Sequence, residues 1–207
     1  MRLFTMLAVV AAGLVLTATG CGGNSSRLSY SARDLPGIVD AKPRLPKWPF
    51  SPFPAHDPAV TLREVLGDSP TSALRAFAAK LKNDGFVIGR QLRWNGEHNY
   101  GDGADSDVVA YLFRTASGAG AFFRTFLPLL HRVGAKVISS KGLGDESAGT
   151  HVPAGLHSVS ESAGYAWRRA NLVIFAELAC PGRCLFNVVP PARTYADEID
   201  ARAKRKA

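Results

Sequence analysis

Hydrophobic residues recur at helical spacing in three parts of the chain. The apolar stripes are Leu74, Phe77, Ala78 and Leu81, then Ala119, Phe122, Phe123, Phe126 and Leu130, then Ala192, Tyr195, Ile199 and Ala203. Ser69-Pro70 is typical of a helix start and Asn83-Asp84-Gly85 of a helix end, so they bound the first helix. The second begins near Ser117, and Pro128 must kink it or end it early. The third is expected over about 191–205.

Strand patterns lie between these helices. Residues 86–94 suit a strand, and residues 108–113 are apolar on both faces, as expected for a central strand. A further strand is expected at 135–139. The segments 165–169 and 172–178 are also strand-like and close enough together in sequence to form a hairpin.

The hairpin is predicted to turn at Ala170-Asn171. A two-residue turn there places Trp167 opposite Ile174. Ala170 is a poorer turn residue than Asn or Gly, which leaves the register open.

The order of these elements predicts an α+β fold. We expect one globular domain over residues 59–207, with an antiparallel sheet of about five strands and about three helices packed mainly on one face. The domain is long enough to bury a core of its own.

Residues 21–58 are predicted to be a disordered tether, because prolines recur there too often for a sheet or a helix. An extended tether of this length would hold the domain tens of ångströms above a membrane. The aromatic residues Trp48, Phe50 and Phe53 within it are expected to dock on the domain, with a lipid surface as the alternative.

Residues 1–20 have the features of a lipoprotein signal peptide. Arg2 precedes an apolar run from Leu3 to Leu16, and Ala18-Thr19-Gly20-Cys21 is a lipobox that marks Cys21 for a diacylglycerol thioether. An uncleaved anchor helix is the alternative, but the run is shorter than the roughly 20 residues that span a bilayer. We therefore expect a protein anchored in the cell membrane on its extracytoplasmic face, with two acyl chains giving stable attachment.

The other two cysteines, Cys180 and Cys184, form a close pair around Pro-Gly-Arg. In an oxidising compartment this spacing predicts a small structural disulfide loop. A redox-active site is the alternative, but thioredoxin-like motifs have two residues between the cysteines rather than three.

The chain has 25 basic and 17 acidic residues, a formal net charge of +8. A basic body beside anionic lipids is attracted to them. The charges are scattered apart from the run 202–206, which a solvated helix end explains, so we expect no nucleic-acid partner.

The most polar segment, residues 97–107, contains Asp102, Asp105 and Asp107 and is predicted to be a mobile loop. Its oxygen ligands would suit Ca²⁺, although the spacing does not fit an EF-hand. Trp94 and Tyr100 lie beside these acids in the sequence and could line a pocket, with core or rim packing as the alternative.

Glu177 is a candidate binding-site acid because it interrupts an apolar strand. A buried carboxylate must find a partner, and a cation such as Arg168 or an edge position would satisfy it.

Other catalytic or metal-binding patterns are weak. His151 and His157 have no third patterned ligand, so we expect no metal site. Gly144 and Gly149 do not make a Gly-x-Ser-x-Gly elbow around Ser147, and these glycines more simply allow a tight turn. No cofactor motif is present, so we expect no cofactor.

Three stretches carry a family resemblance, namely 108–126, 142–147 and 167–173. They resemble segments of exported actinobacterial lipoproteins and, more distantly, the extracellular sensor domain of mycobacterial serine/threonine kinases. The resemblance covers roughly residues 60–205 and implies an antiparallel sheet, a helix-flanked cleft and a ligand-sensing role.

Two functions follow from these observations. The first is a non-catalytic binding or sensing module that is held to the membrane by its lipid and that recognises an envelope ligand or protein. The second is a cell-envelope hydrolase whose carboxylates are brought together by the fold.

Overall fold

A computed structural model describes residues 29–44, 50–52, 58–96, 103–130, 135–155, 160–181 and 184–207. Within these residues, eight strands form one antiparallel sheet in the order β1-β3-β4-β8-β7-β6-β5, and β2 also pairs with β3. The strands are β1 (Phe50–Pro52), β2 (Ala59–Val60), β3 (Phe86–Gly96), β4 (Ala104–Phe113), β5 (Lys136–Ile138), β6 (Glu146–Val152), β7 (Ser160–Arg169) and β8 (Leu172–Pro181). The helices are a 3-10 turn (Ala32–Asp34), α1 (Leu35–Val39), α2 (Leu62–Leu66), α3 (Ser72–Asn83), α4 (Ala116–Leu130) and α5 (Val189–Lys206).

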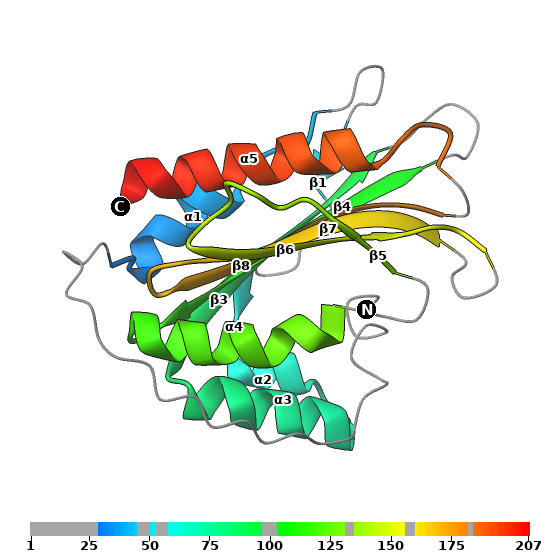
Figure 1. The fold of residues 1–207 in the computed structure, drawn as a ribbon. Helices are drawn as coiled ribbons and strands as arrows, with labels where there is room; N and C mark the ends of the chain where they lie inside the picture. The colour runs from blue at the N-terminus through cyan, green and yellow to red at the C-terminus, as the bar shows by residue number, and fades with distance from the viewer. Residues whose placement is uncertain are drawn as a thin grey trace.

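The α+β class is confirmed, but helices cover both faces of the sheet (Figure 1), contrary to the prediction of one face. Helices α1 and α5 lie on one side, and α2, α3 and α4 lie on the other. The reason is visible in the central strand β4. Its residues Val108, Ala110 and Leu112 belong to the core under α5, whereas the alternate residues of the same strand belong to the core over α4. A strand that is apolar on both faces must be covered on both.

Helix α5 packs through the stripe predicted from its sequence, since Ala192, Tyr195, Ile199 and Ala203 are all buried. Asp200 is buried as well, with 2% of its surface exposed. It is compensated by Arg169 of β7, whose guanidinium donates two hydrogen bonds of 2.9 Å to the two carboxylate oxygens. This ion pair joins α5 to the sheet.

The core on the α4 side is largely aromatic. Neighbouring ring centroids lie between 4.6 Å, for Phe126 and Phe175, and 6.3 Å, for Phe77 and Tyr111. Tilted and edge-on contacts of this kind contribute beyond the apolar area that they bury. Pro128 lies inside α4, which continues to Leu130, so the proline does not end the helix early.

Residues 30–41 belong to the folded domain, which corrects the prediction that the tether extends to residue 58. Tyr30, Leu35, Ile38 and Val39 are buried in the α5-side core. Phe50 is also buried, so its expected docking on the domain is confirmed, while Trp48 and Phe53 lie outside the described residues. The prediction relied on the frequency of prolines in this segment and gave no weight to the apolar residues that lie among them.

The β7–β8 hairpin has the predicted register, with Trp167 opposite Ile174. Ala170 adopts a left-handed conformation with φ of 50°, which the turn requires. Asn171 beside it is buried, and its side chain bonds to the backbone of Tyr30 and Phe113. The turn is therefore fixed from inside the protein.

Several short elements differ from the prediction. Helix α3 starts after Thr71, whose Oγ1 accepts a hydrogen bond of 3.2 Å from the Leu74 amide, rather than at Ser69-Pro70. Helix α2 and strands β1, β2 and β6 raise the count of elements above that expected. Strand β6 follows the glycine turn at 142–144, where the sequence predicted a loop.

Candidate functional site

A row of polar side chains crosses the α4 side of the sheet beyond the aromatic core. We call it the polar ladder and define it as Gln91 and Arg93 of β3, Asp107 of β4 and Glu177 of β8. Gly164 of β7, which has no side chain, lies at the end of this row. Across neighbouring strands, Arg93 pairs with Asp107, Asp107 pairs with Glu177, and Glu177 pairs with Gly164. Gln91 lies two residues before Arg93 on the same face of β3.

The alternation of each strand creates this ladder. On β4, apolar Val109 is followed on the same face by Asp107, and on β8 Phe175 is followed on that face by Glu177. Val109 pairs with Phe175 and Asp107 pairs with Glu177. The face therefore changes from apolar to charged at the same level on both strands.

Asp107 is the best-connected residue of the ladder. Its Oδ1 accepts a hydrogen bond of 3.0 Å from the Gln91 amide, and its Oδ2 lies 3.2 Å from the Arg93 guanidinium. The side chains of Arg93 and Asp107 are 23% and 18% exposed. Burial raises the pKa of Asp107 above its ordinary value, against the opposing effects of the Gln91 hydrogen bond and the Arg93 charge. The carboxylate is thus held in place yet is costly to keep ionised.

Glu177 is half-buried beside Asp107. Directly opposite residues of an antiparallel pair have Cβ atoms roughly 5 Å apart, so the two acids are close neighbours. On its other side Glu177 faces Gly164, which has no side chain to cover it. The expected partner Arg168 is too far along the hairpin, opposite Val173, and contacts Asp145 and Glu146 instead.

The structure relocates several predicted site residues. Asp105 and Asp107 lie in strand β4 rather than in a mobile loop, because they pair with β3 and β8. Trp94 lies on the opposite face, packed against the α5-side core, so it does not line a pocket with these acids. Cys21, Tyr100 and Asp102 lie outside the described residues.

Gln91, Arg93 and Gly164 were missed as site residues. Reading 86–94 as a strand with a period of two places Gln91 and Arg93 on one face, which is a usable signal. Only the strand order brings that face beside Glu177.

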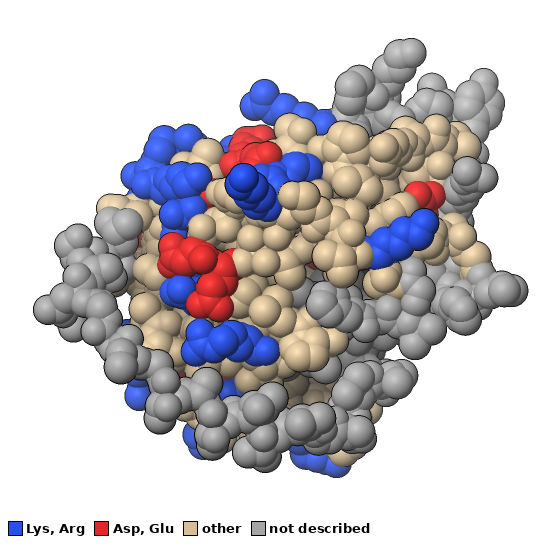
Figure 2. All heavy atoms as spheres, in the orientation of Figure 1, with Lys and Arg blue, Asp and Glu red and all other residues tan. Residues whose placement is uncertain are grey.

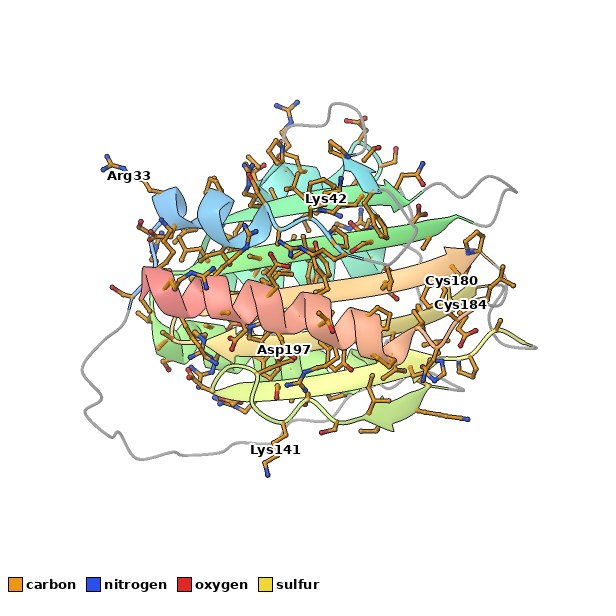
Figure 3. All side chains as sticks on the ribbon, turned by 90° about the horizontal axis from the view of Figure 1, so that it is seen from above. Arg33, Lys42, Lys141, Cys180, Cys184 and Asp197 are labelled. Carbon is orange, nitrogen blue, oxygen red and sulfur yellow. A yellow bond between two sulfur atoms is a disulfide. The ribbon has the colours of Figure 1, made fainter. Side chains whose placement is uncertain are left out.

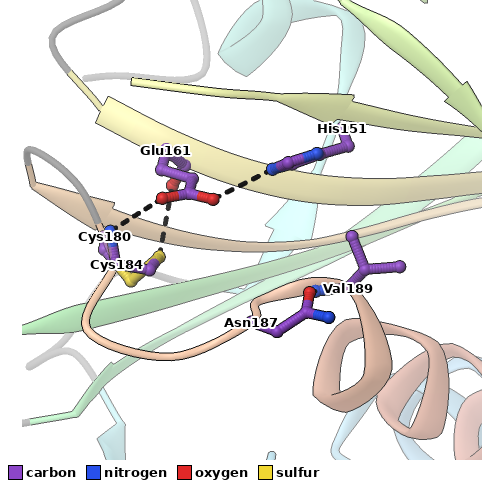
Figure 4. The surroundings of a disulfide bond; sticks show 6 residues. All are labelled: His151, Glu161, Cys180, Cys184, Asn187 and Val189. Atoms are coloured by element: carbon purple, nitrogen blue, oxygen red, sulfur yellow. Dashed lines mark hydrogen bonds and ion pairs between the residues drawn. A yellow bond between two sulfur atoms is a disulfide. The ribbon is translucent and has the colours of Figure 1, made fainter. Parts of the chain in front are cut away.

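The predicted disulfide between Cys180 and Cys184 is present and lies beside Glu161 (Figure 4). Glu161 Oε2 accepts a hydrogen bond of 2.9 Å from the Cys184 amide, and Oε1 lies 3.0 Å from His151 Nε2. His157 lies outside the described residues. The contacts connect the disulfide loop to β7 and β6 and give the cysteines a structural setting.

The segment around Ser147 also has a structural setting. Ser147 Oγ lies 3.0 Å from both the carbonyl oxygen and the hydroxyl of Ser140. A Cβ atom on Gly144, which has φ of 53°, would overlap the backbone of Arg168. Within the parts of the chain that the structure describes, no group of three or more His, Cys, Asp and Glu side chains could hold a metal ion.

The chain is similar to a solved structure rather than to a known sequence family. No family model matches the sequence, and no curated protein is similar to it. The structure resembles the crystal structure of the extracellular domain of PknH from Mycobacterium tuberculosis, with a TM-score of 0.49 and 11% identity. The match covers 86% of this chain and 93% of that domain.

None of the helices in the described ranges is both long and apolar enough to span a membrane.

Proposed function

We propose that this protein is an extracytoplasmic binding module, anchored in the cell membrane through lipid on Cys21, and that the polar ladder is its binding surface. The lipobox supports the anchor, and the Cys180–Cys184 disulfide suits an oxidising compartment. The ladder supports the binding role.

The observation that carries the proposal is the pair of adjacent acids, Asp107 and Glu177, on the sheet face that the aromatic core also occupies. Ionised groups are costly to remove partly from water, and positions that break the local hydrophobic pattern in this way are commonly functional. Asp107 and Glu177 offer hydrogen-bond acceptors, and Arg93 offers donors beside them. This combination suits a polar ligand, or a polar segment of a protein, that carries several hydrogen-bond donors.

Photocrosslinking on intact cells tests the proposal. A photoreactive amino acid replaces Ala179, which follows Glu177 on the same face of β8, and in a matched control it replaces Val87 of β3, which is 50% exposed. We expect a discrete adduct from position 179 and none from position 87. Asp107→Asn and Glu177→Gln should each weaken the adduct, because each removes a charged acceptor. The same adducts from both positions, unaffected by these substitutions, would contradict a role for the ladder.

The second candidate, an envelope hydrolase, is favoured by one observation. Two neighbouring carboxylates, one of which has a raised pKa, could divide the roles of acid and base. Hydrolysis would then be lost in both Asp107→Asn and Glu177→Gln, whereas a binding module has no such activity to lose. Release of labelled fragments from purified cell wall by the wild-type protein, and by neither variant, would favour the hydrolase.

A further inference from the structure

The N-terminal end of the described domain is held against α5 by hydrogen bonds. The Tyr30 amide donates a hydrogen bond of 2.8 Å to Asn171 Oδ1, and the Tyr30 hydroxyl donates one of 3.1 Å to the carbonyl oxygen of Ala203. Further along the segment, the Tyr195 hydroxyl donates to the Ala41 carbonyl oxygen. Tyr30 is therefore fixed next to the C-terminal end of α5, and we call this point, from which the sequence runs back to Cys21, the chain exit.

The covalent distance between that point and the proposed lipid is short. Tyr30 lies nine positions after Cys21, and an extended chain spans at most about 3.6 Å per residue, or roughly 30 Å. The predicted tether from residue 21 to residue 58 would span about four times that distance. The domain is therefore confined close to the bilayer.

Basic residues gather at the same end of the molecule. Arg33, Arg205 and Lys206 are exposed, and none of them forms an ion pair with another described residue. Figure 3 places Arg33 at the end where α5 finishes, and Figure 2 shows Lys and Arg side chains gathered over that end of α5.

Two nearby acids offset only part of this charge. Asp200 is already paired with Arg169 and Lys204. Asp34 accepts hydrogen bonds from the backbone and hydroxyl of Ser31, which with the charge of Lys206 lower its pKa, so it is ionised and offsets one of the three positive charges. The surface around the chain exit is therefore positive.

We propose that this end of the domain, comprising Arg33, Arg205, Lys206 and the chain exit at Tyr30, rests on an anionic phospholipid surface. The nearness of the bilayer rests on the proposed anchoring at Cys21, while the attraction comes from charge complementarity. Cations at a helix C-terminus also favour the helix dipole, but that effect gives no reason for Arg33 to lie at the same end.

This orientation directs the polar ladder away from the lipid. Asp107 lies six residues along β4 from Phe113, whose carbonyl oxygen bonds Asn171 beneath Tyr30. At about 3.3 Å per residue the ladder lies roughly 20 Å from that end of the strand. A ligand of the ladder would therefore approach from the side of the envelope that is remote from the membrane.

Fluorescence quenching in vesicles tests the proposal with the full, natively processed protein. A dye is attached at Ala207→Cys, next to the basic residues, or at Asp68→Cys, in the exposed segment between α2 and α3. Each protein is reconstituted into vesicles that contain headgroup-nitroxide lipid, with either phosphatidylcholine alone or a mixture with phosphatidylglycerol. We expect stronger quenching at position 207 than at 68 in the anionic vesicles, and the difference should decrease with added salt.

Charge variants make the test specific. Each Lys or Arg near an anionic surface contributes roughly fivefold to its partitioning, so Arg33→Gln/Arg205→Gln/Lys206→Gln should reduce the orientation preference by roughly 100-fold and equalise the two dyes. The matched control replaces three exposed cations elsewhere, Arg63, Lys82 and Lys136, by Gln and should leave the difference intact.

Three outcomes separate the proposals. Incorporation into vesicles with selective quenching at 207 supports the lipid-facing surface. Incorporation with equal quenching, or equal effects of the two triple variants, overturns this surface and leaves the anchor standing. Failure of the purified protein to incorporate overturns the anchor and, with it, the short covalent distance on which the surface depends.

Discussion

Replacing Asn171 by alanine should release the N-terminal segment from the domain. Asn171 is 6% exposed, and its side chain makes three hydrogen bonds, of 2.8, 3.0 and 2.9 Å, to the Tyr30 amide, the Tyr30 carbonyl oxygen and the Phe113 carbonyl oxygen. Each buried hydrogen bond contributes about 1 kcal/mol, and groups left without a partner cost about 1–3 kcal/mol each. We therefore expect the free energy of unfolding to fall by about 3 kcal/mol.

Urea denaturation followed by circular dichroism measures this change. Asn83→Ala is the matched control, because Asn83 is exposed on α3 and surface substitutions usually change stability by less than about 0.5 kcal/mol. Limited proteolysis should also show earlier cleavage within 29–44 in Asn171→Ala. A loss close to that of the control, with the segment still protected, would refute the role assigned to Asn171.

Three further predictions concern the other contacts. Arg169→Ala removes two hydrogen bonds from the buried Asp200 and leaves it the ion pair with Lys204, so the unfolding free energy should fall by about 3 kcal/mol, the low end of the range for breaking a buried ion pair; a loss below about 1 kcal/mol in urea denaturation would contradict this. Because the folded-state pKa of Asp107 is raised, its contribution to stability is favourable at low pH and is lost as pH rises through that pKa. Asp107→Asn should therefore stabilise the protein at pH 7 but not below the ordinary pKa of 3.8. Urea unfolding at pH 7 and at a pH below 3.8 tests this, and a loss of stability at pH 7 would contradict it. Gly144→Ala combines a left-handed φ with overlap of the backbone of β7, so its thermal unfolding midpoint should fall further than that of Gly85→Ala, where the new Cβ meets only ordinary contacts; equal midpoints would show that the overlap is relieved.

The sequence predicted those elements whose patterns are local. The buried stripe of α5 follows from helical spacing, and the pairing of Trp167 with Ile174 follows from the length of one turn. The two apolar faces of 108–113 also predicted a central strand. The same pattern implies that helices cover both faces of the sheet, so the prediction of helices on one face was inconsistent with it.

Other features depend on contacts between distant residues. Tyr30 and Ile38 are buried because they meet α5, more than 150 residues away along the chain, and their own neighbours give little sign of it. Asp105 and Asp107 looked like loop residues because acids are poor strand formers, but pairing with β3 and β8 overrides that preference.

In the candidate site, too, local patterns identify single residues, whereas contacts between distant strands bring them together. Glu177 could be singled out from the sequence as a charge in an apolar strand and Asp107 as one acid of a polar loop, but their pairing depends on β8 lying beside β4. Arg93 became a site residue only through that strand order.

Attachment of lipid at Cys21 is the claim on which both the location and the lipid-facing surface depend. Intact-mass analysis of the protein purified from the membrane fraction tests it most directly. The account predicts a mature chain that begins at Cys21 and carries the mass of a diacylglyceryl thioether. An unmodified chain that keeps its first twenty residues would contradict it.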